Sequence, residues 1–229
     1  MKRRATEKYQ DRVLKLLSGK ADDFYLAGGT SLAKFYFQHR LSDDLDFFTS
    51  EFKYKRVVEM VKFLSGKLNK KIELIAEQIN DDKMSKIMVY VIPISTNSFL
   101  KIDFVEDNVK LLKPLKSVDG IFTLSLEDIY LRKIYAAAGF IEKINVTGNI
   151  VLAGGRQEAK DFYDIYFLSQ TFMKLSDFAA KYCGHIQTEG IVRWFRTYDR
   201  MTIKTGLLEL KTQEKPDYKK MENHFKNEI

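Results

Sequence analysis

The chain of 229 residues is poor in the side chains that build disulfides and zinc sites. Its one cysteine, Cys183, excludes an intrachain disulfide and is typical of a protein kept in a reducing compartment. The three histidines, His39, His185 and His224, are scattered along the chain, so a zinc site is not expected. We therefore expect a cytoplasmic protein whose chemistry depends on other residue types.

Long apolar runs are also missing. The longest, at residues 87–94, is far too short to cross a bilayer, which takes about 20 residues. The N-terminal stretch MKRRATEKYQDR is basic and has no apolar core, so we expect neither a secretory signal nor a membrane partner. With 45% hydrophobic and 30% charged residues, the composition is that of a globular protein with one large or two modest domains.

Positive charge is in modest excess. The chain has 38 Lys and Arg against 31 Asp and Glu, a formal net charge of +7. This balance favours acidic partners such as nucleic acid, nucleotides or an acidic protein. Because the lysines are interspersed with acidic residues, an ordinary solvated surface would give the same numbers. The charge agrees with an RNA partner without requiring one.

The most informative stretch is residues 26–48, LAGGTSLAKFYFQHRLSDDLDFF. Gly28 and Gly29 have no side chains, so their backbone N–H groups can approach a phosphate closely. Thr30 or Ser31 is expected to cap the helix that follows, whose N-terminus favours an anion. This half of the stretch therefore predicts a phosphate-binding turn.

Two acidic residues follow on a predicted strand. Asp44 and Asp46 are two residues apart, so they point to the same face of the strand while their neighbours face the core. Their repulsion needs compensation, and Mg²⁺ is often bound by one or two carboxylates together with substrate phosphates. The alternative is that Ser42-Asp43-Asp44 caps a turn and Asp46 is merely exposed.

A third acid lies in another predicted strand, SFLKIDFV at residues 98–105. Leu100, Ile102 and Phe104 form its apolar face, and Asp103 lies on the opposite one. An unpartnered charge in such an apolar segment would be costly. A metal ion, or a lysine partner such as Lys101, would compensate it. The remaining alternative is an edge-strand aspartate facing water.

These motifs resemble the nucleotidyltransferases of the DNA polymerase beta superfamily. The matching segments are Gly28-Gly29-Thr30, Arg40-x-Ser42-x-Asp44-x-Asp46-Phe47 and Lys101-Ile102-Asp103-Phe104. More narrowly, the chain is similar to the AbiEii-type branch, the toxin component of type IV toxin–antitoxin systems. A helical lysine followed by a Lys/Arg-Asp-x-x-Asp helix marks that branch, and here it reads LEDIYLRKIYAAA and then RQEAKDFYDIYFL, with Lys133, Lys160, Asp161 and Asp164. The intervening segment, residues 140–155, is longer and richer in glycine than the family pattern.

The resemblance implies an enzyme that moves a nucleotidyl group from an NTP to an acceptor hydroxyl and releases pyrophosphate. It implies Mg²⁺, with Mn²⁺ as the alternative, an RNA acceptor such as the tRNA 3′ end, and an antitoxin partner protein. The implied catalytic residues are Asp44, Asp46, Asp103, Lys133 and Asp161, of which the first three bind metal. The implied nucleotide-binding residues are Gly28, Gly29, Thr30, Ser31, Arg40, Lys160 and Asp164.

Spacing leaves alternatives open in the second half. Lys160 and Asp164 are four residues apart on a predicted helix and would form an ordinary surface pair. Lys133 lies mid-helix among apolar residues, where a lysine extends to solvent unless it reaches a cleft and offsets triphosphate charge. At the level of function, a drug-modifying enzyme of the aminoglycoside type and a non-catalytic nucleic-acid-binding relative remain alternatives.

A further array is formed by Arg193, Arg196 and Arg200, close to Trp194 and Tyr198. It would suit a nucleic-acid stripe with a stacking aromatic. The alternative is a solvated helix face beside a core tryptophan.

The fold class predicted is α+β (mixed α/β), a small mixed sheet with flanking helices followed by a helical C-terminal domain. We expect a nucleotidyltransferase core at residues 1–115 and the helical domain at 116–229, with a linker at 111–120 and a turn at Asn80-Asp81-Asp82. Strands are predicted at 24–27, 45–49, 72–78, 86–92 and 99–105. Helices are predicted at 6–18, 31–39, 51–68, 126–138, 158–170, 176–183, 188–198 and 216–227.

Overall fold

The computed structural model describes residues 5–79, 85–139, 141–153 and 155–229, and the turn predicted at Asn80-Asp81-Asp82 lies outside them. The chain forms two compact units. The first comprises Met1–Tyr36 and Ser42–Ser125, and the second comprises Phe37–Leu41 and Leu126–Ile229. In the described part of the chain, no helix is both long and apolar enough to span a bilayer.

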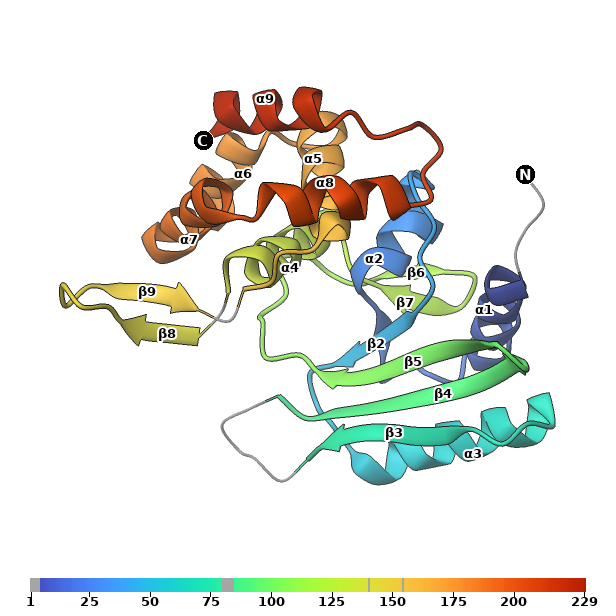
Figure 1. The fold of residues 1–229 in the computed structure, drawn as a ribbon. Coiled ribbons are helices and arrows are strands. Elements are labelled where there is room, and N and C mark those ends of the chain that lie inside the picture. Colours follow the sequence, from blue (N-terminus) through green and yellow to red (C-terminus); the bar gives the residue numbers. More distant parts are fainter. Residues whose placement is uncertain (1–4, 80–84, 140, 154) are drawn as a thin grey trace. The chain divides into compact units, whose positions relative to one another are not determined.

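The first unit is built on a seven-stranded mixed sheet with the order β3-β4-β5-β2-β1-β7-β6 (Figure 1). Two of its pairings, β2 with β5 and β1 with β7, are parallel, and the other four are antiparallel. The strands are β1 (Tyr25–Leu26), β2 (Leu45–Thr49), β3 (Glu73–Gln78), β4 (Ile87–Ser95), β5 (Ser98–Glu106), β6 (Lys116–Val118) and β7 (Ile121–Thr123).

Helices α1 (Ala5–Leu17) and α3 (Tyr54–Leu68) supply the other half of this unit's core. Their buried leucines and valines recur at helical spacing and meet the apolar side of the alternating strands. Phe104 on β5 is fully buried and contacts the rings of Phe24, Phe47 and Tyr90. A short helix, α2 (Gly28–Ser31), follows β1 and continues into a π-helical segment, η1 (Leu32–Phe37).

The second unit is mainly helical and carries one hairpin, formed by β8 (Ile141–Ile144) and β9 (Ile150–Ala153). Its helices are α4 (Leu126–Ala138), α5 (Ala159–Thr171), α6 (Leu175–Tyr182), α7 (His185–Thr197), α8 (Arg200–Glu209) and α9 (Tyr218–Glu228). Phe162, Trp194 and Phe225 form an aromatic core between α5, α7 and α9. The segment around Arg40 joins this unit through an antiparallel bridge to Thr212.

The predicted fold class is confirmed: a mixed sheet with flanking helices precedes a helical region. The strand predicted at 45–49 has the predicted bounds, and α4 ends at Ala138 before Gly139, which has a φ of 96°. The linker predicted at 111–120 instead includes β6 and runs up to β7. The glycine-rich segment at 140–155 contains the β8–β9 hairpin, and α8 was not predicted. These missed strands are three or four residues long, too short to show a clear alternation.

The burial pattern of β5 gives a stability prediction. Phe104→Ala should destabilise the protein by about 3–5 kcal/mol, because a fully buried ring is lost. Phe99, on the same strand, is 61% exposed, so Phe99→Ala should change stability by no more than about 0.5 kcal/mol. Urea unfolding followed by circular dichroism measures both. Equal losses for the two variants would contradict the assigned strand register.

Candidate active site

Strand pairing brings two of the predicted acids together. In the parallel pairing of β2 with β5, Asp46 and Asp103 are direct Cα partners. Asp44 was predicted to lie on the same strand as Asp46, but β2 begins at Leu45, so Asp44 lies one residue before it. The Asp44 side chain is 38% exposed and that of Asp103 is 12% exposed. Asp44 and Asp46 are therefore partly exposed, whereas Asp103 is buried.

A lysine stands among these acids. The Nζ atom of Lys101 lies 2.8 Å from Oδ2 of Asp103 and 3.6 Å from Oδ2 of Asp44. Burial alone would lower the pKa of Lys101, but its hydrogen bond to Asp103 and the charges of Asp103, Asp44 and Asp46 raise it overall. Of the two ways to compensate Asp103 that the sequence left open, the structure shows the lysine partner.

The same geometry tests whether a divalent metal fits. Among the described residues, no group of three or more histidine, cysteine, aspartate or glutamate side chains is arranged to hold a metal ion. The donors are nevertheless carboxylates, which Mg²⁺ prefers, and a positive charge already lies against two of them. A cation thus suits this position, and Asp44, Asp46 and Asp103 are the acids whose charges act on the lysine that lies there.

Gly28 fits closely against this group. It opens α2 with a φ of 64°, and a Cβ atom added there would lie 2.5 Å from Oδ2 of Asp46. Both the left-handed conformation and the missing side chain are therefore needed. The close approach brings the start of α2 against the Asp46 carboxylate.

Thr30 or Ser31 was predicted to cap the helix after this glycine, but neither hydroxyl does so. The N-cap residue is Ala27, and no side chain caps α2. Both hydroxyls are buried and form hydrogen bonds with neighbouring segments of the chain. Thr30 donates to the carbonyl oxygen of Asp44 at 2.5 Å, and Oγ of Ser31 lies 2.5 Å from Oγ1 of Thr123. The capping prediction was wrong because the helix begins at Gly28, three residues earlier than expected.

One contributor to this site was missed from the sequence. Gln10 on α1 is buried, and its Nε2 donates to the carbonyl oxygens of Ser42 at 2.8 Å and Asp44 at 3.2 Å. Together with Thr30, it fixes the backbone that leads into β2. A polar residue within the apolar stripe of the predicted N-terminal helix was the available signal.

The second unit holds a buried ion cluster centred on Asp164. Arg40 makes a bidentate contact with this carboxylate: its Nε lies 2.6 Å from Oδ1 and its Nη2 lies 2.7 Å from Oδ2. Nζ of Lys133 lies 2.7 Å from Oδ2, and Nε2 of His39 lies 2.8 Å from Oδ1. Burial would raise the pKa of Asp164, but the charges of Arg40 and Lys133 and the hydrogen bonds from Arg40 and His39 hold it well below its usual range.

Asp161 completes the cluster one helical turn earlier. Its Oδ1 lies 2.8 Å from Nζ of Lys133, and its Oδ2 lies 2.5 Å from Nε of Arg156. Despite burial, the charges of Lys133 and Arg156 and their hydrogen bonds lower the pKa of Asp161. Burial likewise opposes the charge of Lys133, yet Asp161 and Asp164 raise its pKa overall. All three groups are therefore held in their charged forms.

This arrangement excludes two of the alternatives that spacing left open, the surface pair of Lys160 with Asp164 and the solvent-facing Lys133. Asp164 is fully buried and does not form a surface pair with Lys160, which lies 2.9 Å from Glu158. The Lys133 side chain does not extend to solvent, since it is 5% exposed. Arg40, predicted to bind the nucleotide, uses its guanidinium on Asp164. His39 and Arg156 were not identified as site residues.

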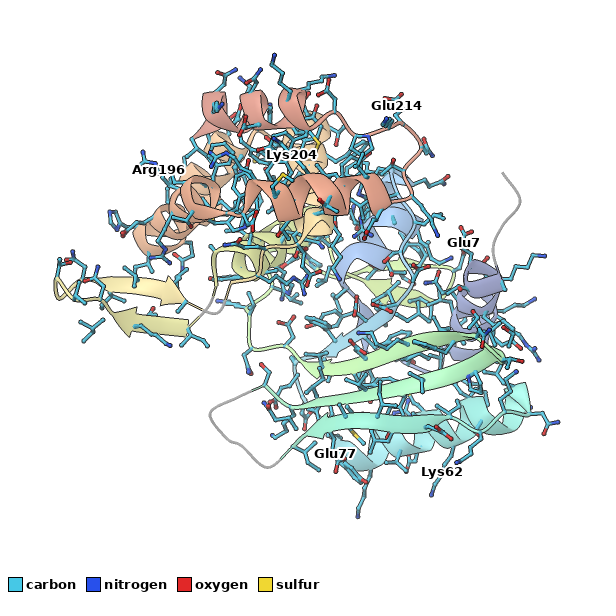
Figure 2. All side chains as sticks on the ribbon, in the orientation of Figure 1. Glu7, Lys62, Glu77, Arg196, Lys204 and Glu214 are labelled. Atoms are coloured by element: carbon cyan, nitrogen blue, oxygen red, sulfur yellow. The ribbon has the colours of Figure 1, made fainter. Side chains whose placement is uncertain are left out.

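The arginine array does not form a stacking platform. Trp194 and Tyr198 are buried in the aromatic core, so neither presents a ring to a base. Arg193 donates to the carbonyl oxygen of Leu152, and Nε of Arg200 lies 3.0 Å from Oε1 of Glu222. Arg196, labelled in Figure 2, is exposed on α7. The alternative of a solvated face beside a core tryptophan is the one observed.

The buried cluster predicts a large effect at Asp164. Asp164→Asn should cost about 3–5 kcal/mol of stability, because Arg40 and Lys133 keep buried charges without their partner. The exposed pair of Lys160 with Glu158 is the control, and Lys160→Met should cost less than about 1 kcal/mol. Chemical denaturation at neutral pH measures both.

The pH dependence of stability follows with a definite sign. A carboxyl group whose pKa is depressed in the folded protein contributes stability above its unfolded pKa and loses it as the pH falls through the folded value. Stability of the unmodified protein should therefore fall as the pH drops below the ordinary carboxyl range. This acid slope should flatten in Asp164→Asn, and an unchanged slope would contradict the assignment.

Comparison with known proteins identifies a family and a relative. The family model described as nucleotidyl transferase AbiEii toxin, type IV toxin–antitoxin system, matches residues 12–228. An uncharacterized protein of Aquifex aeolicus (strain VF5), aq_aa25, is 33% identical over 173 residues, which cover 72% of this chain and 68% of that protein.

Solved structures share the fold. Two Helicobacter pylori structures, the second of which is JHP933, align with TM-scores of 0.58 and 0.57 at 18% identity, covering 96% of this chain and 89% and 86% of theirs. MenT4, the nucleotidyltransferase toxin Rv2826c from Mycobacterium tuberculosis H37Rv, aligns with a TM-score of 0.54 at 14% identity, covering 96% of this chain and 81% of that one. With the family model matching nearly its whole length, the chain belongs to the AbiEii family of nucleotidyl transferase toxins.

Proposed function

We propose that the protein moves a nucleotidyl group from an NTP to a hydroxyl of an RNA acceptor, such as the 3′ end of a tRNA, and releases pyrophosphate. The observation that carries this proposal is the pairing of Asp46 with Asp103 across β2 and β5, with a cation already among the acids. Membership of a nucleotidyl transferase family supports the reaction class.

Asp44, Asp46 and Asp103 are the proposed ligands of Mg²⁺, with Mn²⁺ as the alternative. When bound, such an ion neutralises charge on the phosphate oxygens and helps to activate the attacking hydroxyl. Asp103 accepts or orients the proton of the acceptor hydroxyl. Its limited exposure favours this role, since a carboxylate screened from bulk water interacts more strongly with a nearby proton donor.

The turn at Gly28 and Gly29 is the proposed phosphate contact. The first backbone N–H groups of a helix have no partner within the helix and favour an anion. Thr30 is proposed to contribute its backbone N–H, because its hydroxyl is committed to Asp44. Ser31 is proposed to shape the turn without touching the phosphate, because its N–H donates to the carbonyl oxygen of Ala27 at 3.3 Å and its hydroxyl contacts Thr123. The β- and γ-phosphates of the NTP would lie here, away from the transferred group.

In the second unit, Lys133 is proposed to offset charge on the triphosphate. Asp161 and Asp164 hold its ammonium group in one place, and an ammonium has three donors, of which two are used here. Arg40 then acts by positioning Asp164, not by direct contact with the nucleotide. Lys160 is 40% exposed and is the residue of this motif best able to meet a nucleotide or RNA phosphate directly.

An RNA acceptor is favoured over a cationic drug by the net charge of +7. The description of the matching family as part of a type IV toxin–antitoxin system supports a cognate antitoxin as partner, and with it a cytoplasmic site of action. A drug-modifying transferase would use the same acids on a small hydroxylated acceptor, so only the acceptor separates the two functions.

The experiment is a transfer assay with Mg²⁺, each labelled NTP in turn, and either total tRNA or a panel of aminoglycosides. We expect label on tRNA, at least about 1000-fold less with Asp46→Asn, because a metal ligand is removed. Label on an aminoglycoside would refute the RNA acceptor and support the drug-modifying transferase instead. Absence of transfer under every condition, with Asp46→Asn as toxic to cells as the unmodified protein, would refute both enzymatic functions.

A pair of glycine variants tests the close approach to Asp46. Gly28 and Gly19 both have a φ of 64°, but an added Cβ has no neighbour within 4 Å at Gly19. Both alanine variants should lose about 1–2 kcal/mol through backbone strain. Only Gly28→Ala should also lose transfer, by about 100-fold or more, because Asp46 is displaced. Equal activity of the two variants would contradict a role for this contact.

A further inference from the structure

Lys101 places one positive charge among the three acids, and its side chain is free enough to move away from them. Lys101 and Asp103 lie two residues apart on β5, so their side chains emerge on the same face of the sheet. The ammonium is 2.8 Å from Asp103 and 3.6 Å from Asp44, and the lysine side chain is 31% exposed. A four-carbon chain with this exposure can turn toward solvent without unfolding the strand.

A second ion pair beside the same sheet serves as a comparison. Lys86 lies one residue before β4, and its Nζ is 3.3 Å from Oε1 of Glu106 at the end of β5. That pair is separate from the three acids and is similarly exposed, at 34% for the lysine. The sheet therefore carries two comparable ion pairs, of which one involves the proposed metal ligands.

We propose that Lys101 is an internal counter-ion that occupies the cation position of the metal-free protein and must be displaced when a divalent cation binds. This inference rests on the proposed metal site. One oxygen, Oδ2 of Asp103, accepts from Lys101, so the same oxygen cannot also serve a metal at full strength. The lysine thus stabilises the acids when no metal is present and weakens metal binding when one is.

Two opposite effects follow from removing this charge. Without Lys101, the carboxylates lose the positive charge that lies 2.8 Å from Asp103 and 3.6 Å from Asp44, so their mutual repulsion rises and the metal-free protein becomes less stable. A divalent cation then binds without a competitor, so its affinity rises. An ordinary structural ion pair would give the loss of stability without the gain in affinity, and this difference separates the two roles.

The test uses the full chain and Mn²⁺ alone, without nucleotide. Free Mn²⁺ is followed by electron paramagnetic resonance, and unfolding temperature is measured in EDTA and in Mn²⁺. We expect Lys101→Met to unfold at a lower temperature in EDTA and to bind Mn²⁺ at least tenfold more tightly than the unmodified protein. Lys101→Arg, which keeps the charge, should bind Mn²⁺ within threefold of the unmodified protein.

Controls separate this proposal from the metal site on which it rests. Lys86→Met removes an equal charge from the same sheet and should leave the Kd for Mn²⁺ unchanged. If Asp46→Asn weakens Mn²⁺ binding but Lys101→Met and Lys86→Met give the same Kd, the counter-ion role of Lys101 is overturned and the metal site stands. If Asp46→Asn binds Mn²⁺ as the unmodified protein does, the metal site fails, and the role of Lys101 fails with it.

Discussion

Repulsion between carboxylates that strand pairing holds together is the constraint on which the first unit depends. Asp46 on β2 and Asp103 on β5 are partners across two parallel strands, and Asp44 lies one residue before β2. Backbone hydrogen bonds fix this register, so the Cα atoms of the two residues cannot separate without breaking the sheet. Two surrounding residues relieve the repulsion: Lys101 supplies positive charge, and Gly28 leaves room for the Asp46 carboxylate.

The second unit meets the same problem in a different way. Asp161 and Asp164 lie one helical turn apart in a buried position, and their charges are matched by Arg40, Lys133 and Arg156. Burial makes the charges of Asp161, Asp164, Arg40 and Lys133 costly alone, so these four groups are stable only together, while Arg156 is 47% exposed. Lys101, in contrast, is one partly exposed cation. The second cluster is therefore suited to fixed positioning, and the first to exchange of its cation.

Local pattern predicted the parts of this structure that depend on neighbours in sequence. Alternation identified β5 and placed Asp103 opposite its apolar face, beside Lys101, and helical spacing identified α4 and α5. Spacing failed where a partner comes from far away. Asp164 pairs with Arg40, which is 124 residues distant, and not with the lysine four positions before it.

The same limit explains the errors near the glycine turn. The start of α2 at Gly28 is set by packing against Asp46, which no helix-capping rule includes, so Thr30 and Ser31 were assigned the wrong partners. Gln10, which fixes the backbone before β2, could not be paired with that backbone from sequence because 32 residues separate it from Ser42. The acidic residues could be predicted from the sequence, but the residues that hold them in place could not.

If the three acids form one cation site that serves nucleotidyl transfer, a divalent metal should bind against them together with the nucleotide. Anomalous scattering from a crystal of the protein soaked in Mn²⁺ with a non-hydrolysable NTP measures this. We expect an anomalous peak within coordination distance of Asp46 and Asp103, with the Lys101 ammonium moved away from Asp103. A bound nucleotide with no anomalous peak at these carboxylates, and with Lys101 still on Asp103, would contradict it.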